Sequence, residues 1–266
     1  MSADNFVFGG SIPAKYDRYL GPFIFEPYAV HIAGMIKNNP LKLLEIAAGT
    51  GRVTKHILQQ MEKEALLAAT DLNPDMLAIA KEKVTAHNVE WMVADAQELP
   101  FADNSFDCVV CQFGFMFFPD KQKAFDEVFR VLKPGGQFLL NTWDRIENNR
   151  ATYVCQQTAA SFFQNDPPAF YKIPFSMFDP GEIQHYLTVT GFKNVQVDKV
   201  TLTGKGNAAD IAAGFIEGNP IIAEITKENP SQVETIKTAA VAAISKNFGI
   251  DPVQCELNAW VAEAFK

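Results

Sequence analysis

The sequence predicts an α/β protein built on a doubly wound, mostly parallel sheet. From Leu41 to about Asp144, short apolar segments alternate with segments of helical apolar spacing. The short segments are apolar at nearly every position, which is typical of strands buried on both faces. Crossovers between parallel strands are right-handed, so helices should cover both faces of the sheet. Ligands of such sheets bind beyond the carboxyl ends of the strands.

Five strands and three helices are expected in this region. The expected strands are 41–47, 65–70, 89–94, 106–113 and 137–143, and the expected helices are 52–61, 74–87 and 123–132. Asn73 serves as the cap of the second helix and Pro74 as its first residue. The KPGG segment should end the third helix.

The remaining segments suggest insertions around this core. The expected division is an N-terminal helical lid at 1–40, a core at 41–144, a cap insertion at 145–177, more core at 178–203, a helical cap insertion at 204–252 and a last core strand at 253–266. Within 178–203 we expect a helix at 179–190 and a strand at 195–202, and within 204–252 two helices. The last strand should pair back into the sheet.

Composition narrows the class of protein. The net charge is −8 with a pI near 5.1, and no basic stripe is present, so a nucleic-acid partner is not expected. No apolar run reaches the ~18 residues of a membrane helix, and the start lacks the basic region of a secretory signal. Cys108 and Cys111 lie in an apolar run without a second metal-ligand pair, which favours buried thiols over a zinc site. A reduced, cytoplasmic protein is therefore expected, with a homodimer left open.

A glycine-rich turn follows the first expected strand in LLEIAAGTGRVT (43–54). Gly49 and Gly51 let the backbone bend sharply and admit a ligand against bare peptide groups. The dinucleotide pattern GxGxxG fails at Thr54, where the third glycine should stand, and this weakens a nicotinamide-cofactor interpretation. Asp71 ends the second strand twenty residues after Gly51. A carboxylate there can accept hydrogen bonds from both ribose hydroxyls of an adenosine.

Asp95 follows the third strand in VADAQELPF. Its side chain, or the amide of Ala96, can meet the amino group or a ring nitrogen of adenine. An ordinary turn aspartate is the alternative at this position. Together, Asp71 and Asp95 should bracket one nucleoside.

These motifs, in this order and spacing, resemble the class I S-adenosylmethionine-dependent methyltransferases of the ubiquinone/menaquinone-methyltransferase type. The resemblance rests on LLEIAAGTG, ATDLNPDML, VADAQELPFADNSFDCVV and FRVLKPGG, and covers residues 41–143 most strongly. It implies a seven-stranded, Rossmann-like sheet with an antiparallel last strand. It also implies S-adenosyl-L-methionine as the cofactor and a small-molecule acceptor.

The same resemblance implies a set of cofactor contacts. Glu45 and the turn from Ala47 through Gly49 and Thr50 to Gly51 would hold the methionine part. The nucleoside would lie against Asp71, Leu72, Met76, Asp95, Ala96 and Gln97, with Gln112 beside the sulfonium. Many members have glycine where this chain has Ala47. Tyr16 and Tyr19, three residues apart on one face of an expected helix, would either close over the ligands or pack in the core.

The predicted function is transfer of a methyl group to a mostly apolar or aromatic small molecule. The segments outside the core are rich in Phe, Tyr, Ile and Ala, which favours such an acceptor. Asp144, just past the fifth strand, is better placed for a catalytic base than any histidine, but a surface-loop aspartate is favoured and no base is assigned. A nicotinamide-dependent oxidoreductase and a non-catalytic S-adenosylmethionine-binding protein are the alternatives.

Overall fold

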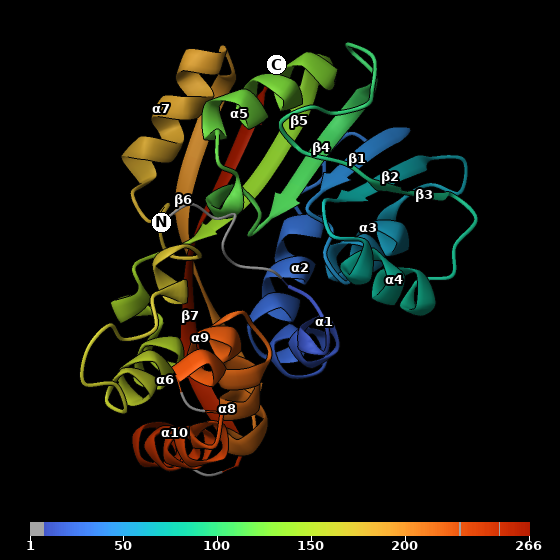
Figure 1. Cartoon of the computed structure of the whole chain (residues 1–266). Coiled ribbons are helices and arrows are strands. Elements are labelled where there is room, and N and C mark those ends of the chain that lie inside the picture. Colours follow the sequence, from blue (N-terminus) through green and yellow to red (C-terminus); the bar gives the residue numbers. More distant parts are fainter. Residues whose placement is uncertain (1–7, 229, 250) are drawn as a thin grey trace. The chain divides into compact units, whose positions relative to one another are not determined.

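The computed structural model describes residues 8–228, 230–249 and 251–266. Its framework is a seven-stranded sheet with the strand order β3-β2-β1-β4-β5-β7-β6 (Figure 1). The strands are β1 (Lys42–Ile46), β2 (Leu66–Asp71), β3 (Val89–Val93), β4 (Phe106–Gln112), β5 (Leu132–Trp143), β6 (Lys193–Gly206) and β7 (Val253–Phe265). The first five pair in parallel, and β7 runs antiparallel to β5, as the sequence predicted.

Helices follow most strands of this sheet. They are α1 (Ile12–Lys15), the π-helix η2 (Tyr16–Phe25), α2 (Glu26–Ala33), α3 (Arg52–Gln60), α4 (Pro74–Lys83), α5 (Lys121–Val131), α6 (Arg150–Ala160), α7 (Pro180–Thr190), α8 (Ala208–Glu217), α9 (Ile221–Glu228) and α10 (Gln232–Phe248), with 3-10 turns η3 (Phe115–Phe117), η4 (Ile146–Asn148) and η5 (Phe170–Lys172). Asn73 caps α4 by accepting from the amides of Asp75 and Met76, as predicted. The segment 204–252 holds three helices, not the two expected.

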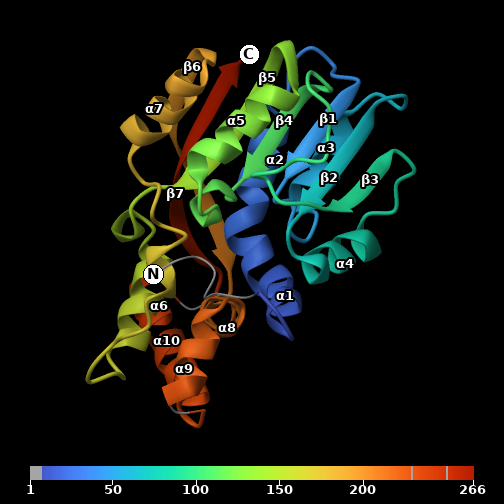
Figure 2. The ribbon, with the colours of Figure 1, turned by 45° about the horizontal axis from the view of Figure 1, so that its top comes forward.

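The two faces of the sheet are covered by different helices. On one face, α2 and α3 pack on the central strands through one buried cluster, whose members are Ala29, Ile32, Ala33, Leu43, Val53, Ile57, Leu67, Cys108, Val110 and Leu139. On the other face α5 and α7 lie together (Figures 1 and 2), with Phe125 stacked on Tyr186 and Phe138 on Phe192. Alternation along β5 places Leu139 and Phe138 on opposite faces. The sheet is thus doubly wound, and its carboxyl edge is left for loops.

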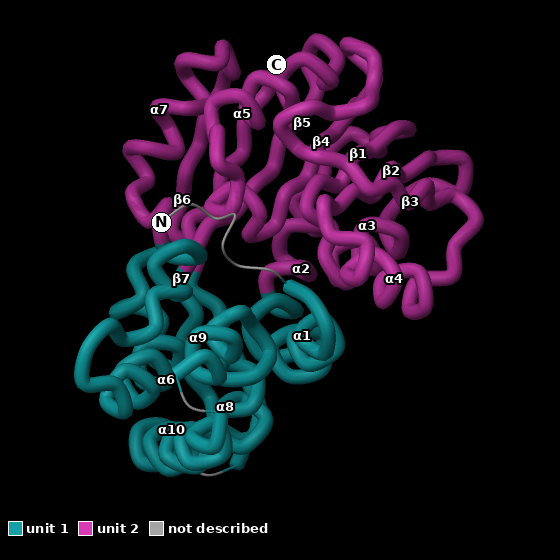
Figure 3. Tube along the Cα trace, in the orientation of Figure 1, with its two compact units in different colours: residues 1–27, 144–175, 201–258 teal, residues 28–143, 176–200, 259–266 magenta. Residues whose placement is uncertain are grey.

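The chain divides into two compact units (Figure 3). Unit 1 contains residues 1–27, 144–175 and 201–258, and unit 2 contains residues 28–143, 176–200 and 259–266. Unit 2 holds the five parallel strands and the turns that follow them. Unit 1 is mostly helical, with α8 and α10 at its centre.

The N-terminal segment is divided between the two units. Residues 28–33 belong to unit 2, where Tyr28 and Ile32 are fully buried. Residues 8–27 belong to unit 1, where Leu20 and Phe23 are buried and a Cβ added to Gly214 of α8 would lie 2.8 Å from Leu20. The apolar face of the segment is therefore already covered in both units.

Candidate cofactor site

The turn after β1 carries three left-handed residues within five positions. Ala47, Gly49 and Gly51 have φ of +53°, +55° and +79°, and α3 begins directly afterwards at Arg52. The left-handed conformation costs a residue with a Cβ about 1–2 kcal/mol, so glycine is the favoured residue at each of these positions. The alanine at position 47 is therefore strained.

The two glycines of the turn have different roles. A Cβ added to Gly49 would meet no atom within 4 Å, whereas one added to Gly51 would lie 3.0 Å from the Cβ of Ala80 and 3.4 Å from the Trp91 ring. Gly51 thus allows α4 and β3 to approach the turn. Gly49 alone leaves bare backbone facing open space, where a ligand can lie against peptide groups.

Asp71 ties the turn after β1 to the end of β2. Its Oδ2 accepts from the Gly49 amide at 2.8 Å, and its Oδ1 accepts from the Asn73 amide at 2.8 Å. Burial raises the pKa of this carboxyl, while the amide hydrogen bonds from Asn73, Gly49 and Leu72 oppose the rise. A carboxylate can accept further hydrogen bonds on its remaining lone pairs. The side chain can therefore hold the turn and still bind hydroxyl groups of a ligand.

Glu45 lies on β1 beneath the turn, 2% exposed. The Thr54 hydroxyl donates to its Oε2 at 2.5 Å. Burial raises the pKa of Glu45 to about 8, against the opposing effect of the hydrogen bonds from Thr54 and with a further upward contribution from Asp71. Thr54 occupies the place of the missing third glycine, and sequence reasoning did not assign it this role. The available signal was the spacing, since Thr54 carries a hydroxyl nine residues after the carboxylate of Glu45.

Asp95 and Gln97 lie at the end of β3, beside Asp71. The register pairs Asp71 with Val93, and the Ala94 amide donates to the Asp71 carbonyl at 3.1 Å. Asp95 Oδ1 accepts from the Gln97 amide at 2.8 Å, and Gln97 Oε1 accepts from the Asp120 amide. Asp95 therefore stabilises its own turn, as the turn-aspartate alternative expected. The structure nonetheless brings the two acids to neighbouring strand ends, as the sequence predicted.

The other expected nucleoside contacts differ in their exposure. Leu72 is 67% exposed and leaves apolar surface beside Asp71, whereas Met76 and Ala96 are 5% and 7% exposed. Lys83 of α4 adds a contact that the sequence did not reveal, since its Nζ donates to the Thr50 carbonyl at 3.1 Å. The turn after β1 is thus fixed by side chains from two later segments.

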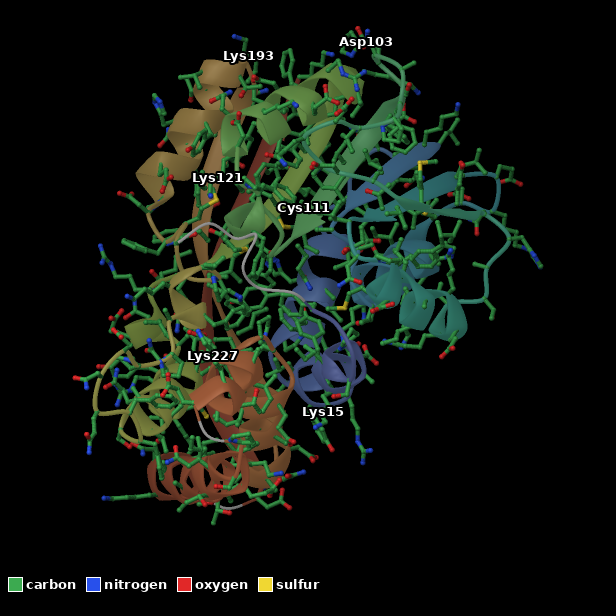
Figure 4. All side chains as sticks on the ribbon, in the orientation of Figure 1. Lys15, Asp103, Cys111, Lys121, Lys193 and Lys227 are labelled. Carbon is green, nitrogen blue, oxygen red and sulfur yellow. The ribbon has the colours of Figure 1, made fainter. Side chains whose placement is uncertain are left out.

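Gln112 ends β4 and pairs in register with Asn141 of β5. The chain then turns at Phe113, whose amide donates to the backbone oxygen of Asn141 at 3.1 Å and to its Oδ1 at 2.9 Å. Figure 4 labels Cys111 at this end of β4. Cys111, like Cys108, is a fully buried free thiol with a raised pKa, as its apolar strand predicted.

Tyr16 and Tyr19 belong to unit 1 and lie in a π-helix, not in the α-helix expected. Tyr16 packs against Phe25 with ring centroids 4.8 Å apart, and Arg18 lies over the Tyr19 ring. Asp144 is also in unit 1 and is 3% exposed. Its Oδ1 accepts from the Arg145 amide and its Oδ2 from Asn148 Nδ2. The surface-loop interpretation of Asp144 was wrong, because the carboxylate is buried inside its own turn.

Comparison with known proteins shows the family of this chain. The profile of the ubiE/COQ5 methyltransferase family matches residues 28–165, which is more than half of the chain. The chain belongs to the ubiE/COQ5 methyltransferase family. Among curated relatives, it is 36% identical over 140 residues to the ubiquinone/menaquinone biosynthesis C-methyltransferase UbiE of Proteus mirabilis, covering 49% of this chain and 55% of that protein. For UbiE of Saccharophagus degradans the identity is 34% over 148 residues, covering 52% and 59%. The chain therefore matches somewhat more than half the length of these relatives.

Solved structures share the fold of this family member. The YcgJ protein from Bacillus subtilis aligns with a TM-score of 0.57 at 21% identity, covering 90% of this chain and 98% of that one. A Haemonchus contortus phosphoethanolamine N-methyltransferase 2, solved in complex with S-adenosyl-L-methionine, aligns with a TM-score of 0.63 at 18% identity, covering 100% and 60%. These likenesses support a Rossmann-like methyltransferase fold.

Gly114 gives a direct test of how tightly the turns after β1 and β4 pack. A Cβ added there would lie 2.7 Å from both the Ala47 Cβ and the Cys111 Sγ. We expect Gly114→Ala to lower the free energy of unfolding by about 1–3 kcal/mol, because overpacking forces the neighbours to shift. Ala47→Gly alone should be neutral or mildly stabilising. It removes the strain of a Cβ at a φ of +53° but increases the conformational entropy of the unfolded chain, and the two effects oppose each other.

The double variant is the control for this prediction. Ala47→Gly removes one of the two atoms that the new methyl group would meet, so Gly114→Ala should cost less in that background. Urea unfolding of the four proteins measures the coupling. Strictly additive effects would show that the two turns do not touch.

Proposed function

We propose that this chain transfers a methyl group from S-adenosyl-L-methionine to a small, largely apolar or aromatic acceptor. The observation that carries the proposal is the open space beside the backbone of Gly49. The Gly49 amide donates to Asp71, so this space lies next to the acid that ends β2. Family membership supports it, as does the cofactor bound by the Haemonchus relative. Thr54 stands where the dinucleotide pattern has its third glycine, and its hydroxyl donates to Glu45, so the turn departs from that pattern.

In this proposal each strand end holds a different part of the cofactor. The turn from Ala47 to Gly51, with Glu45 beneath it, takes the methionine part. Asp71 takes the ribose hydroxyls, and Leu72, whose side chain is exposed, covers one side of the adenine. The remaining proposed contacts are Met76, Asp95, Ala96 and Gln97 for the adenine and Gln112 for the sulfonium.

The methyl group would leave the sulfonium in an in-line displacement. Charge disperses as the new bond forms, so the protein's contribution is to align acceptor, carbon and sulfur and to exclude water. We assign no catalytic base, because Asp144 already accepts from Arg145 and Asn148 within its own turn. An acceptor that arrives as an anion or a neutral nucleophile needs none.

Unit 1 is proposed as the cap that binds the acceptor. It contains a set of aromatic rings that contact one another, namely Phe8, Tyr16, Phe23, Phe25, Phe170, Tyr171 and Phe215. Rings of this kind supply apolar contact surface for an aromatic or lipid-like molecule. The cap function and the segment boundaries expected from the sequence stay predictions.

Location and partners also stay predictions. The four cysteines are free and buried, which suits the reduced, cytoplasmic protein that the sequence favours. In the part of the chain that the structure describes, no helix has both the length and the apolar character to cross a bilayer. A homodimer is to be tested by measuring the mass in solution.

Calorimetry with the free protein tests the proposed function. S-adenosylmethionine and S-adenosylhomocysteine should bind at micromolar strength, because the turn and both acids are already ordered. NADH should not bind comparably, since the turn lacks the third glycine, which allows close packing of helix and strand in dinucleotide-binding folds. Tight NADH binding without a response to either sulfur nucleoside would overturn the proposal in favour of an oxidoreductase.

A further inference from the structure

The turn after β4 holds a bulky residue in a conformation that costs free energy. Phe113 has a φ of +52°, in the left-handed region that residues with a Cβ avoid. An outlier of this kind persists only where its surroundings impose it, and such outliers concentrate at functional sites.

Asn141 of β5 imposes the conformation through two hydrogen bonds to one amide. The Phe113 N–H donates to the Asn141 carbonyl at 3.1 Å and to its Oδ1 at 2.9 Å. The Asn141 side chain is 1% exposed, and its Nδ2 has no hydrogen-bond partner among the residues that the structure describes. An unsatisfied buried donor is unfavourable, so the side chain is useful at this position through its Oδ1 acceptor.

Aromatic rings hold the same turn from the other side. The Phe113 ring stacks on Trp143 with centroids 3.7 Å apart and planes at 7°. Tyr28 of α2 packs edge-on against both rings, at 5.3 Å and 5.5 Å, and its hydroxyl donates to the Val200 carbonyl at 2.7 Å. The position of Phe113 is therefore fixed by its amide and by its ring.

This placement presses the turn after β4 against the turn after β1. Gly114 follows Phe113, and a Cβ there would lie 2.7 Å from the Ala47 Cβ. Gln112 precedes Phe113 and stays in register with Asn141 at the sheet edge. Ala47 and Gln112 are proposed contacts of the methionine and sulfonium parts of the cofactor. The proposed nucleoside contacts, Asp71 and Asp95, come from the ends of β2 and β3 instead.

We propose that Asn141 is a positioning residue for the methionine end of the cofactor. It holds the turn after β4 so that Gln112 and the backbone at Ala47 keep their places around the sulfonium. The inference rests on the proposed function, because it uses the cofactor contacts assigned there. Its consequence is a selective effect: the part of the ligand beyond the ribose should depend on Asn141, and the adenosine part should not.

Calorimetry of two ligands with the purified full chain tests this selectivity. The variant Asn141→Leu removes the Oδ1 acceptor but also the unsatisfied donor, so its thermal midpoint should stay close to that of the wild type. Because Gln112 and the backbone at Ala47 are then less firmly positioned, we expect its affinity for S-adenosylhomocysteine to fall about tenfold, which corresponds to about 1.4 kcal/mol, while its affinity for adenosine changes by less than about twofold. Asn141→Asp, which keeps an acceptor for the Phe113 amide, should retain most of the affinity.

Gln137→Leu is the matched control. Gln137 is a buried carboxamide on the same face of β5, four residues earlier, and bonds to Lys37, Met35 and Glu263 at the opposite edge of the sheet. Its loss should lower stability without changing the ratio of the two affinities. An unchanged ratio in Asn141→Leu, or an equal loss for both ligands, would overturn the inference while leaving the proposed function intact. Wild-type protein that binds no S-adenosylhomocysteine would overturn both.

Discussion

Replacing Asp71 with alanine should lower the affinity for S-adenosylhomocysteine by tenfold to a hundredfold or more. Two effects combine in this loss. The charge-assisted hydrogen bonds to the ribose are each worth about 1.5–3 kcal/mol, and 1.4 kcal/mol corresponds to one decade in affinity. In addition, the Gly49 amide loses its acceptor at 2.8 Å, so the turn after β1 is no longer held in place. Calorimetry measures the change directly.

Asn73→Ala is the control that distinguishes a loss of ligand affinity from a loss of folding stability. Asn73 lies two residues away and caps α4, so its removal should cost about 1 kcal/mol of folding free energy. It has no proposed contact with the ligand, and its variant should keep nearly wild-type affinity. If Asp71→Ala binds as well as Asn73→Ala does, the ribose lies elsewhere and the site assignment is wrong.

Replacing Glu45 with glutamine should make the free protein more stable at high pH. The pKa of Glu45 is raised to about 8 by burial, from an ordinary value of 4.5. The folded protein therefore keeps a proton there that the unfolded chain releases, and stability falls as the pH rises from about 4.5 to 8. With 1.36 kcal/mol for each unit of pKa, the full fall amounts to at most about 5 kcal/mol. Glutamine has no proton to lose and can still accept from Thr54.

The measurement is urea unfolding of both proteins between pH 5 and pH 9. The stability of Glu45→Gln relative to the wild type should be smallest near pH 5 and should increase toward pH 8. Thr54→Val provides the contrast, because it removes the hydroxyl bonded to Glu45 and leaves the titrating group in place. Its stability should still fall with pH. A pH-independent difference between Glu45→Gln and the wild type would mean that Glu45 is ionised in the folded protein throughout this range.

Local patterns in the sequence were sufficient for the elements and for the polar residues that end the strands. Apolar runs and helical spacing predicted each of the five parallel strands and the helices between them. Strands that are buried on both faces of a sheet need apolar residues at nearly every position, and this pattern is visible in the sequence. Asn73 and Pro74 marked the start of α4 for the same local reason. Since parallel strands end at one edge, Asp71 and Asp95 were expected to meet, and the register of β2 and β3 brings their strand ends together.

Tertiary structure decided which side chains hold these turns. The sequence offered no reason to connect Phe113 with Asn141, Thr54 with Glu45 or Lys83 with Thr50, because each contact depends on how separate segments pack. The sequence also gave no reason to distinguish Gly49 from Gly51. In the structure, Ala80 and Trp91 pack close to Gly51, whereas Gly49 faces open space. The division of residues 1–40 between two units was likewise hidden, since an aromatic helical segment has the same composition whichever core it enters. Burial and turn formation can be predicted from the types of neighbouring residues, whereas the partner of a buried side chain depends on how distant segments pack in the whole fold.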